Sequence, residues 1–142
     1  MKKENRKIGK KIVFILSVEP YSQDCIVVVN GQFSDALNEI KKHKTANSLL
    51  VQKHVSENAE LYKDDYEMDG GGRLYTKLPK GYIMLISHCG DLVDTVGLVT
   101  HECLHLTHYV LTNAGITLTK ESEEAYTYLC EKLVESILQK IY

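Results

Sequence analysis

The chain has 142 residues, of which 44% are hydrophobic and 25% charged, and its formal net charge is −2 at pH 7. This composition is typical of one globular domain that can bury a core without disulfide bonds, and it excludes collagen-like, disordered and disulfide-scaffold chains. The small net charge gives no general attraction to nucleic acid or to anionic membranes, and no apolar run approaches the roughly 20 residues of a membrane-spanning helix.

The cysteines indicate a reducing compartment. All four stand singly, with no C-x-x-C pair (Cys25, Cys89, Cys103 and Cys130), so we expect a cytoplasmic protein with free thiols. Residues 1–11 are basic and precede an apolar run that is too short for a secretory signal and has no small-residue cleavage site after it. We therefore expect a flexible basic tail over residues 1–11, within a single domain that spans residues 1–142.

The first half of the chain predicts two strands followed by two helices. Residues 12–18 and 25–30 are rich in Ile and Val and are separated by a connection with Pro, Ser and Asp, which is typical of paired strands. Ser34 can cap a helix that extends to about His43, and Thr45 can cap a second helix with apolar residues at helical spacing. Residues 64–72 are acidic and end in three glycines, which predicts a loop.

The second half predicts a hairpin followed by two long helices. Residues 73–78 and 82–87 are joined by Pro-Lys-Gly, a sequence suited to a turn between strands. Asp91 can cap a helix over about residues 92–113, Gly115 can end it, and a last helix runs from about Glu121 to the end of the chain. The fold class is therefore α+β, with a small mixed or antiparallel sheet packed on these two helices.

The most informative motif is His-Glu-Cys-Leu-His at residues 101–105, an H-E-x-x-H sequence. On a helix, His101 and His105 lie on one face a single turn apart, so both can offer a ring nitrogen to one Zn²⁺ ion. Glu102 lies about 100° around the helix axis, from where it can take a proton from a water that the metal activates. Apolar residues beside the motif place it at the edge of the core, with Cys103 packed inside (residues 98, 99, 103, 106 and 110).

A catalytic zinc needs a third protein ligand and one open position. His108 is about 10 Å along the axis from His101, too far to share an ion with both histidines on an unbroken helix. Glu124 is the better source, because a hairpin of the two last helices would bring it level with His105. Glu121 and Glu123 stay open as alternatives, although acidic residues also favour the first turn of any helix.

These residues resemble a known family. H-E-x-x-H followed by Glu-Ala-Tyr (residues 124–126) is similar to the gluzincin zinc metallopeptidases, particularly the minimal bacterial and phage enzymes, and distantly to the ImmA/IrrE-type proteases. The resemblance covers about residues 91–133. It implies a zincin-like fold, His101, His105 and Glu124 as zinc ligands, and Glu102 as the general base. Tyr126 and Tyr128 are candidates for stabilising the oxyanion.

The sequence therefore predicts a zinc-dependent hydrolase, most simply a peptidase, that acts on a peptide or protein. A non-catalytic, zinc-stabilised binding or regulatory module is the alternative. We expect an extended peptide to add to the sheet at residues 82–87, as the edge strand nearest the active-site helix. The basic tail lacks interleaved aromatic residues, so no nucleic-acid partner is expected. Among the other candidate ligands, His88 and Cys89 form a weak soft-metal pair, and His43 and His54 are expected on helix surfaces.

Overall fold

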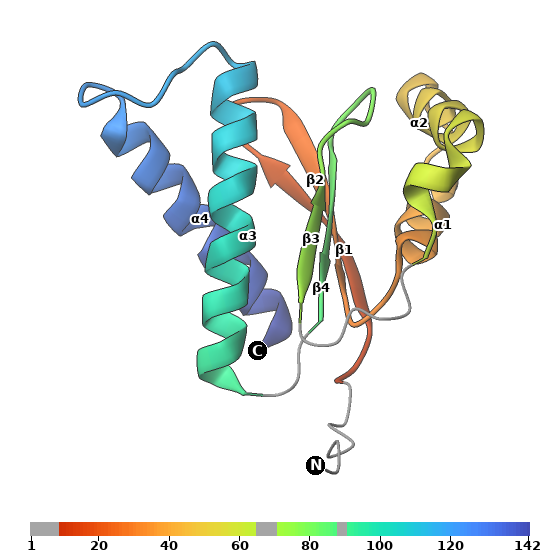
Figure 1. Cartoon of the computed structure of the whole chain (residues 1–142), viewed down its shortest axis with the longest axis horizontal. Coiled ribbons are helices and arrows are strands. Elements are labelled where there is room, and N and C mark those ends of the chain that lie inside the picture. The colour runs from red at the N-terminus through yellow and green to blue at the C-terminus, as the bar shows by residue number, and fades with distance from the viewer. Residues whose placement is uncertain (1–8, 65–70, 88–90) are drawn as a thin grey trace.

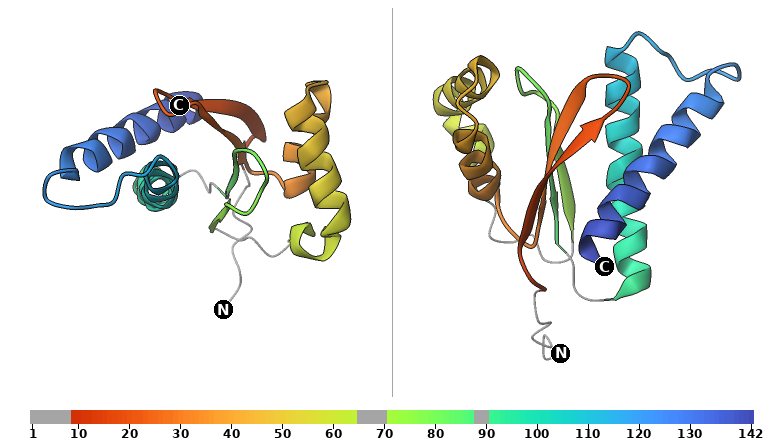
Figure 2. Two further views of the ribbon diagram at one scale, coloured as in Figure 1. Left: turned by 90° about the horizontal axis from the view of Figure 1, so that it is seen from above. Right: turned by 180° about the vertical axis from the view of Figure 1, so that it is seen from behind.

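The computed structural model describes residues 9–64, 71–87 and 91–142. These residues form three layers, in which a four-stranded sheet has two shorter helices on one face and two long helices on the other (Figures 1 and 2). The elements in chain order are β1 (Ile12–Val18), β2 (Gln23–Val29), α1 (Phe33–Lys42), α2 (Ala46–Glu57), the 3-10 turn η1 (Ala59–Tyr62), β3 (Gly72–Tyr75), β4 (Tyr82–Ile86), α3 (Leu92–Asn113) and α4 (Glu123–Ile141). The predicted α+β class with a small mixed sheet is confirmed.

The strand order is β1-β2-β4-β3. β1 pairs antiparallel with β2, β2 pairs parallel with β4, and β4 pairs antiparallel with β3, which confirms both predicted strand pairs. All five residues of β4 are buried, as expected of a strand with helices on both faces. The hypothesis that residues 82–87 form the edge strand is wrong, because β4 lies inside the sheet and β3 forms the edge. That hypothesis relied on residues 82–87 directly preceding α3 in the sequence. The continuous apolar run of this strand instead indicates a strand inside the sheet, buried on both faces.

The start of α1 also differs from the prediction. The helix begins at Phe33, with Gln32 as its N-cap, so Ser34 lies inside the first turn. The Asp35 carboxylate explains this difference, because it accepts a hydrogen bond from the Gln32 backbone N–H at 2.8 Å. Lys11 Nζ contacts its other oxygen, also at 2.8 Å. A carboxylate that returns to the residue three positions earlier satisfies a free donor at the helix start.

The other helix boundaries lie close to the predicted ones. Thr45 accepts a hydrogen bond from the Ser48 N–H at 3.1 Å at the start of α2. Asp91 accepts from two first-turn N–H groups of α3, at 2.8 and 3.1 Å. Gly115 follows α3 with φ of 80°, a left-handed conformation that glycine adopts readily. α4 begins at Glu123, slightly later than predicted.

The α3 side of the sheet carries the larger core. The predicted apolar stripe of α3 is confirmed, since Val99, Cys103, Leu106 and Val110 are fully buried and Leu98 is half-buried against them. They pack on residues of β1, β2 and β4 and on the apolar face of α4. A second core on the other face joins the sheet to α1, α2 and η1. No helix of the described residues is long and apolar enough to cross a membrane.

Hydrogen bonds around Tyr82 tie the end of α3 to the sheet. The Tyr82 hydroxyl accepts from Asn113 Nδ2 at 2.6 Å and donates to Gln23 Oε1 at 2.7 Å. Gln23 Nε2 in turn donates to the Val110 carbonyl at 3.4 Å. These contacts fix the height of α3 relative to β2 and β4. They therefore also fix the H-E-x-x-H residues, which lie about two to three turns earlier on the same helix.

Candidate metal centre

His101 and His105 lie one turn apart in the middle of α3, and both side chains are exposed. Their Nε2 atoms are 3.2 Å apart. The ring centroids are separated by 4.8 Å, and the ring planes meet at 74°. The two ring nitrogens thus approach each other on one face of α3. The structure therefore brings together the two histidines that the H-E-x-x-H motif predicts as a pair.

This separation fits a zinc ion. Zn–N bonds are about 2.0–2.1 Å long, so two Nε2 atoms 3.2 Å apart subtend an angle of about 100° at one ion, close to the tetrahedral value. Two imidazoles with a neighbouring carboxylate are also the donor types of catalytic zinc sites. The same distance permits a hydrogen bond between the rings when one Nε2 carries a proton.

Glu102 lies against the edge strand β3, where its side chain is next to Gly72. Only 5% of its surface is exposed. Burial raises the pKa of its carboxyl above the ordinary value, while the neighbouring His101 and His105 oppose that shift. A raised pKa brings a carboxylate closer to the range in which it can both accept and return a proton near neutral pH.

Gly72, the first residue of β3, provides the space for the Glu102 side chain. A Cβ atom at this glycine would lie 2.7 Å from both Cγ and Oε1 of Glu102. The sequence placed Gly72 in a loop and assigned it no function. The available signal was a glycine directly before a strand, since such a glycine often marks close approach of another group.

The predicted third ligand is not brought to the histidine pair. Glu124 is exposed in the first turn of α4. Among the residues with described positions, no group of three or more His, Cys, Asp or Glu side chains could hold a metal ion. Tyr126 packs near His108, with ring centroids 6.3 Å apart. Since α4 runs antiparallel to α3, Glu124 lies further toward the C-terminal end of α3 and not level with His105.

The connection between the two helices accounts for this offset. Residues 114–122 form a wide loop, and the first turn of α4 lies apart from α3 (Figure 1). The Tyr126 hydroxyl donates to the Ile116 carbonyl at 2.7 Å and so braces this loop. Tyr128, the other candidate for oxyanion stabilisation, is 62% exposed. Glu121 and Glu123 are exposed in the same region, so all three glutamates stay candidates for the third ligand.

The remaining candidates do not extend the centre. His88 and Cys89 lie outside the described residues. His43 and His54 belong to the end of α1 and to α2, on the other side of the sheet (Figure 1). Cys103 is fully buried, and burial raises the pKa of its thiol. It is therefore held protonated, in agreement with its predicted role in packing.

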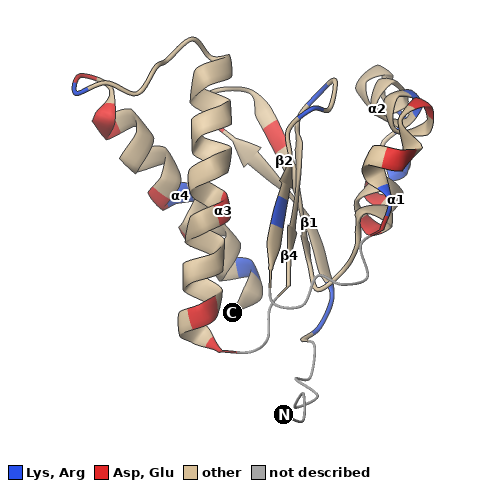
Figure 3. Ribbon diagram, viewed as in Figure 1, with Lys and Arg blue, Asp and Glu red and all other residues tan. Residues whose placement is uncertain are grey.

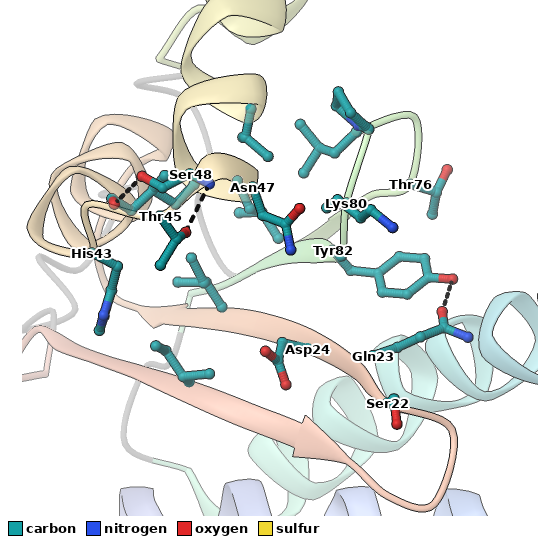
Figure 4. Close-up of a pocket in the computed structure, with 18 of the residues that line it drawn as sticks. Ser22, Gln23, Asp24, His43, Thr45, Asn47, Ser48, Thr76, Lys80 and Tyr82 are labelled. Carbon is teal, nitrogen blue, oxygen red and sulfur yellow. Dashed lines mark hydrogen bonds between the residues drawn. The ribbon is translucent and has the colours of Figure 1, made fainter.

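A cavity of about 630 Å³ lies away from the histidines, on the α1–α2 side of the sheet. Its walls come from the starts of β2 and β4, the β3–β4 turn and the first turn of α2 (Figure 4). The polar side chains around it include Asp24, Thr45, Asn47 and Lys80. Its lining includes neither histidine of the pair. The cavity is therefore separate from the candidate metal centre, which lies on the exposed face of α3.

Comparisons with known proteins assign no relatives. No protein-family profile matches the chain, and no significant match is found among curated proteins or solved structures.

Proposed function

We propose that the protein is a zinc-dependent peptidase with a gluzincin-like site on a zincin-like fold. The observation that carries this proposal is the convergence of His101 and His105 at 3.2 Å on the helix that also carries the buried Glu102. The edge strand beside Glu102 supports it further, because an extended peptide can add there. No nucleic-acid or membrane partner is part of the proposal.

His101 and His105 would hold the zinc ion together with a carboxylate of the α4 region, for which Glu124 is the proposed ligand. When bound, the ion supplies Lewis-acid chemistry, which lowers the pKa of a water molecule and polarises the substrate carbonyl. For Glu124 to take part, the first turn of α4 must move toward α3. Zinc content of purified protein tests this, since Glu124→Ala should lose zinc as His101→Ala does. Retained zinc in Glu124→Ala would move the ligand to Glu121 or Glu123.

Glu102 is the proposed general base. Its carboxylate takes the proton of the attacking water and then gives it to the amine that leaves when the peptide bond breaks. Its location between the histidines and Gly72 is consistent with this role, because the carboxylate then lies between the metal ligands and the strand that would hold the substrate.

The β3 strand is the proposed substrate strand, in place of residues 82–87. It is the last strand of the sheet, and no strand of the described part of the chain pairs with its outer side. It also lies against α3 through Gly72 and Glu102. Main-chain hydrogen bonds to such an edge hold a peptide extended with little dependence on its side chains.

The decisive variant is Glu102→Gln. It keeps the shape of the side chain and removes the base, so we expect wild-type zinc content and a loss of hydrolysis of about 10²–10⁴-fold. Zinc is measured by elemental analysis, and hydrolysis is measured as new termini in a proteome-derived peptide library. Wild-type cleavage by zinc-loaded Glu102→Gln would contradict the assigned role.

A non-catalytic, zinc-stabilised module is the second candidate. A structural zinc site is normally closed by four protein ligands, so this module requires one more ligand than the catalytic site. In that case removal of zinc by a chelator should unfold the protein, and no peptide should be cleaved. The peptidase proposal predicts that the chelated protein keeps its helical circular-dichroism signal, because the core does not include the histidine pair.

A further inference from the structure

The backbone groups at the free side of β3 can be assigned from its pairing with β4. The Gly71 carbonyl accepts a hydrogen bond from the Ser87 N–H at 2.9 Å, and these residues lie opposite each other in the antiparallel register. Hydrogen-bonded pairs alternate with non-hydrogen-bonded pairs in such a register. The N–H and C=O groups of Gly72 and Leu74 therefore point outward, where an added strand would bind them.

Side chains of β3 alternate between the two faces of the sheet. Gly72 and Leu74 face α3, where Gly72 touches Glu102 and Leu74 packs on the core. Arg73 and Tyr75 face the α1 side, where Tyr75 belongs to the second core. A peptide added to this edge would likewise present alternate side chains to the metal centre and to Arg73.

Arg73 is held in place at this edge. Its guanidinium carbon lies 4.8 Å from the centroid of the Tyr75 ring. That ring is only 7% exposed and packs on Phe33 and Tyr62, with centroid distances of 4.8 and 5.8 Å. Stacking on a fixed ring orients a guanidinium and leaves its donors free for a carboxylate.

Arg73 also lacks an acidic partner within the described ranges. None of the ion pairs between described residues involves Arg73. Their basic members are Lys11, Lys42, His43, Lys53, Lys63 and Lys132. Arg73 is the basic residue of β3, and Figure 3 marks the basic and acidic segments of the described elements in blue and red. A fixed guanidinium without a carboxylate partner in the described ranges, beside a strand edge with which no described strand pairs, is suited to recognising an anion on a bound strand.

We propose that Arg73 selects substrates with an acidic side chain, at the residue that lies opposite Arg73 on the added strand. This inference rests on the proposed peptidase function and names the substrate class of the same site. The opposite residue would form a non-hydrogen-bonded pair with Arg73, because Gly72 and Leu74 provide the outward hydrogen bonds. In such pairs the Cα atoms are only about 4.5 Å apart, so the two side chains lie in contact.

Peptide binding tests this without requiring cleavage. The probes are fluorescein-labelled octapeptides that alternate Thr with Glu, Gln or Lys, so that every second side chain is acidic, neutral or basic in any register. Fluorescence anisotropy at 0.15 M salt measures their affinity for zinc-loaded Glu102→Gln protein. We expect the Glu peptide to bind about five to ten times tighter than the Gln peptide.

Variants of Arg73 in the same background isolate its contribution. Arg73→Gln should remove the preference for the Glu peptide, and Arg73→Glu should favour the Lys peptide instead. Lys53→Gln is the matched control, because it removes the same charge from α2 and should leave the preference unchanged. Thermal unfolding confirms that each variant is folded.

The outcomes separate this inference from the function on which it rests. Equal binding of all three peptides, or an unchanged preference in Arg73→Glu, overturns selection by Arg73 and leaves a peptidase without this specificity. Failure of every peptide to bind overturns both the inference and strand addition at β3. Loss of zinc from the parent protein would instead contradict the metal centre, and elemental analysis reports it independently.

Discussion

Replacement of Gly72 by alanine tests the position of the proposed base most directly. The new methyl group would lie 2.7 Å from Cγ and Oε1 of Glu102 and 2.9 Å from its Cδ, whereas ordinary contacts begin at 3.4 Å. The carboxylate must therefore move by about 0.7 Å, because it is the flexible partner and the strand backbone is held by β4. Gly72 is not in the left-handed region, so alanine does not strain the strand itself.

A displacement of this size should reduce catalysis without removing the metal. A misplacement of about 1 Å in a reacting group can cost on the order of 100-fold, so we expect kcat to fall about 10–100-fold while zinc content is unchanged. The assay follows cleavage of fluorescein-labelled casein by zinc-loaded protein. Gly71→Ala is the matched control, because nothing lies within 4 Å of its added Cβ, and it should cleave at the wild-type rate.

Titration provides a second measurement that is independent of hydrolysis. Burial raises the pKa of the Glu102 carboxyl, so a side chain pushed toward solvent should titrate at lower pH. Carboxyl-carbon NMR of the metal-free Gly72→Ala protein should show this decrease. Unchanged titration together with wild-type kcat would refute the idea that Gly72 positions Glu102.

Three further predictions concern stability, each measured by denaturant unfolding. Although burial opposes ionisation of Asp35, the Lys11 hydrogen bond and the Gln32 N–H lower its pKa. Asp35→Asn should therefore cost about 1 kcal/mol above the ordinary pKa of 3.8, and this difference should vanish as pH falls through the lower folded-state pKa. Gly97→Ala should stabilise α3 by about 0.5–1 kcal/mol, because its added methyl group meets open space; a decrease would indicate that this face is covered. Leu106→Ala should cost about 2–5 kcal/mol, since the side chain is fully buried, and a loss below 1 kcal/mol would contradict that packing.

Local patterns predicted most of the elements and the close approach of His101 and His105. The i, i+4 spacing of His101 and His105 is a property of one helix, so it could be predicted without knowledge of the rest of the fold. The caps at Thr45 and Asp91 are local for the same reason. The start of α1 was missed because Asp35, three residues into the segment, satisfies the Gln32 N–H and competes with the cap at Ser34.

The remaining features depend on contacts between distant segments. Placing β4 inside the sheet requires its parallel pairing with β2, which is separated from it by two helices and β3. The contact of Gly72 with Glu102 depends on how β3 packs against α3, so a glycine before a strand indicates a close approach but does not identify Glu102 as the partner. The position of Glu124 along the α3 axis depends on how the loop before α4 packs. The number of residues between Glu124 and the histidines does not determine that position.

The β3–β4 hairpin controls two alignments at once. One of its strands offers Gly72 and Arg73 at the open edge, and the other carries the Tyr82 hydroxyl that holds Asn113 at the end of α3. A residue inserted into the turn between them, or a shift of register, would move the edge against the helix by roughly the 3.3 Å rise of one strand residue. The hairpin thus sets the spacing between the β3 edge and the histidine pair.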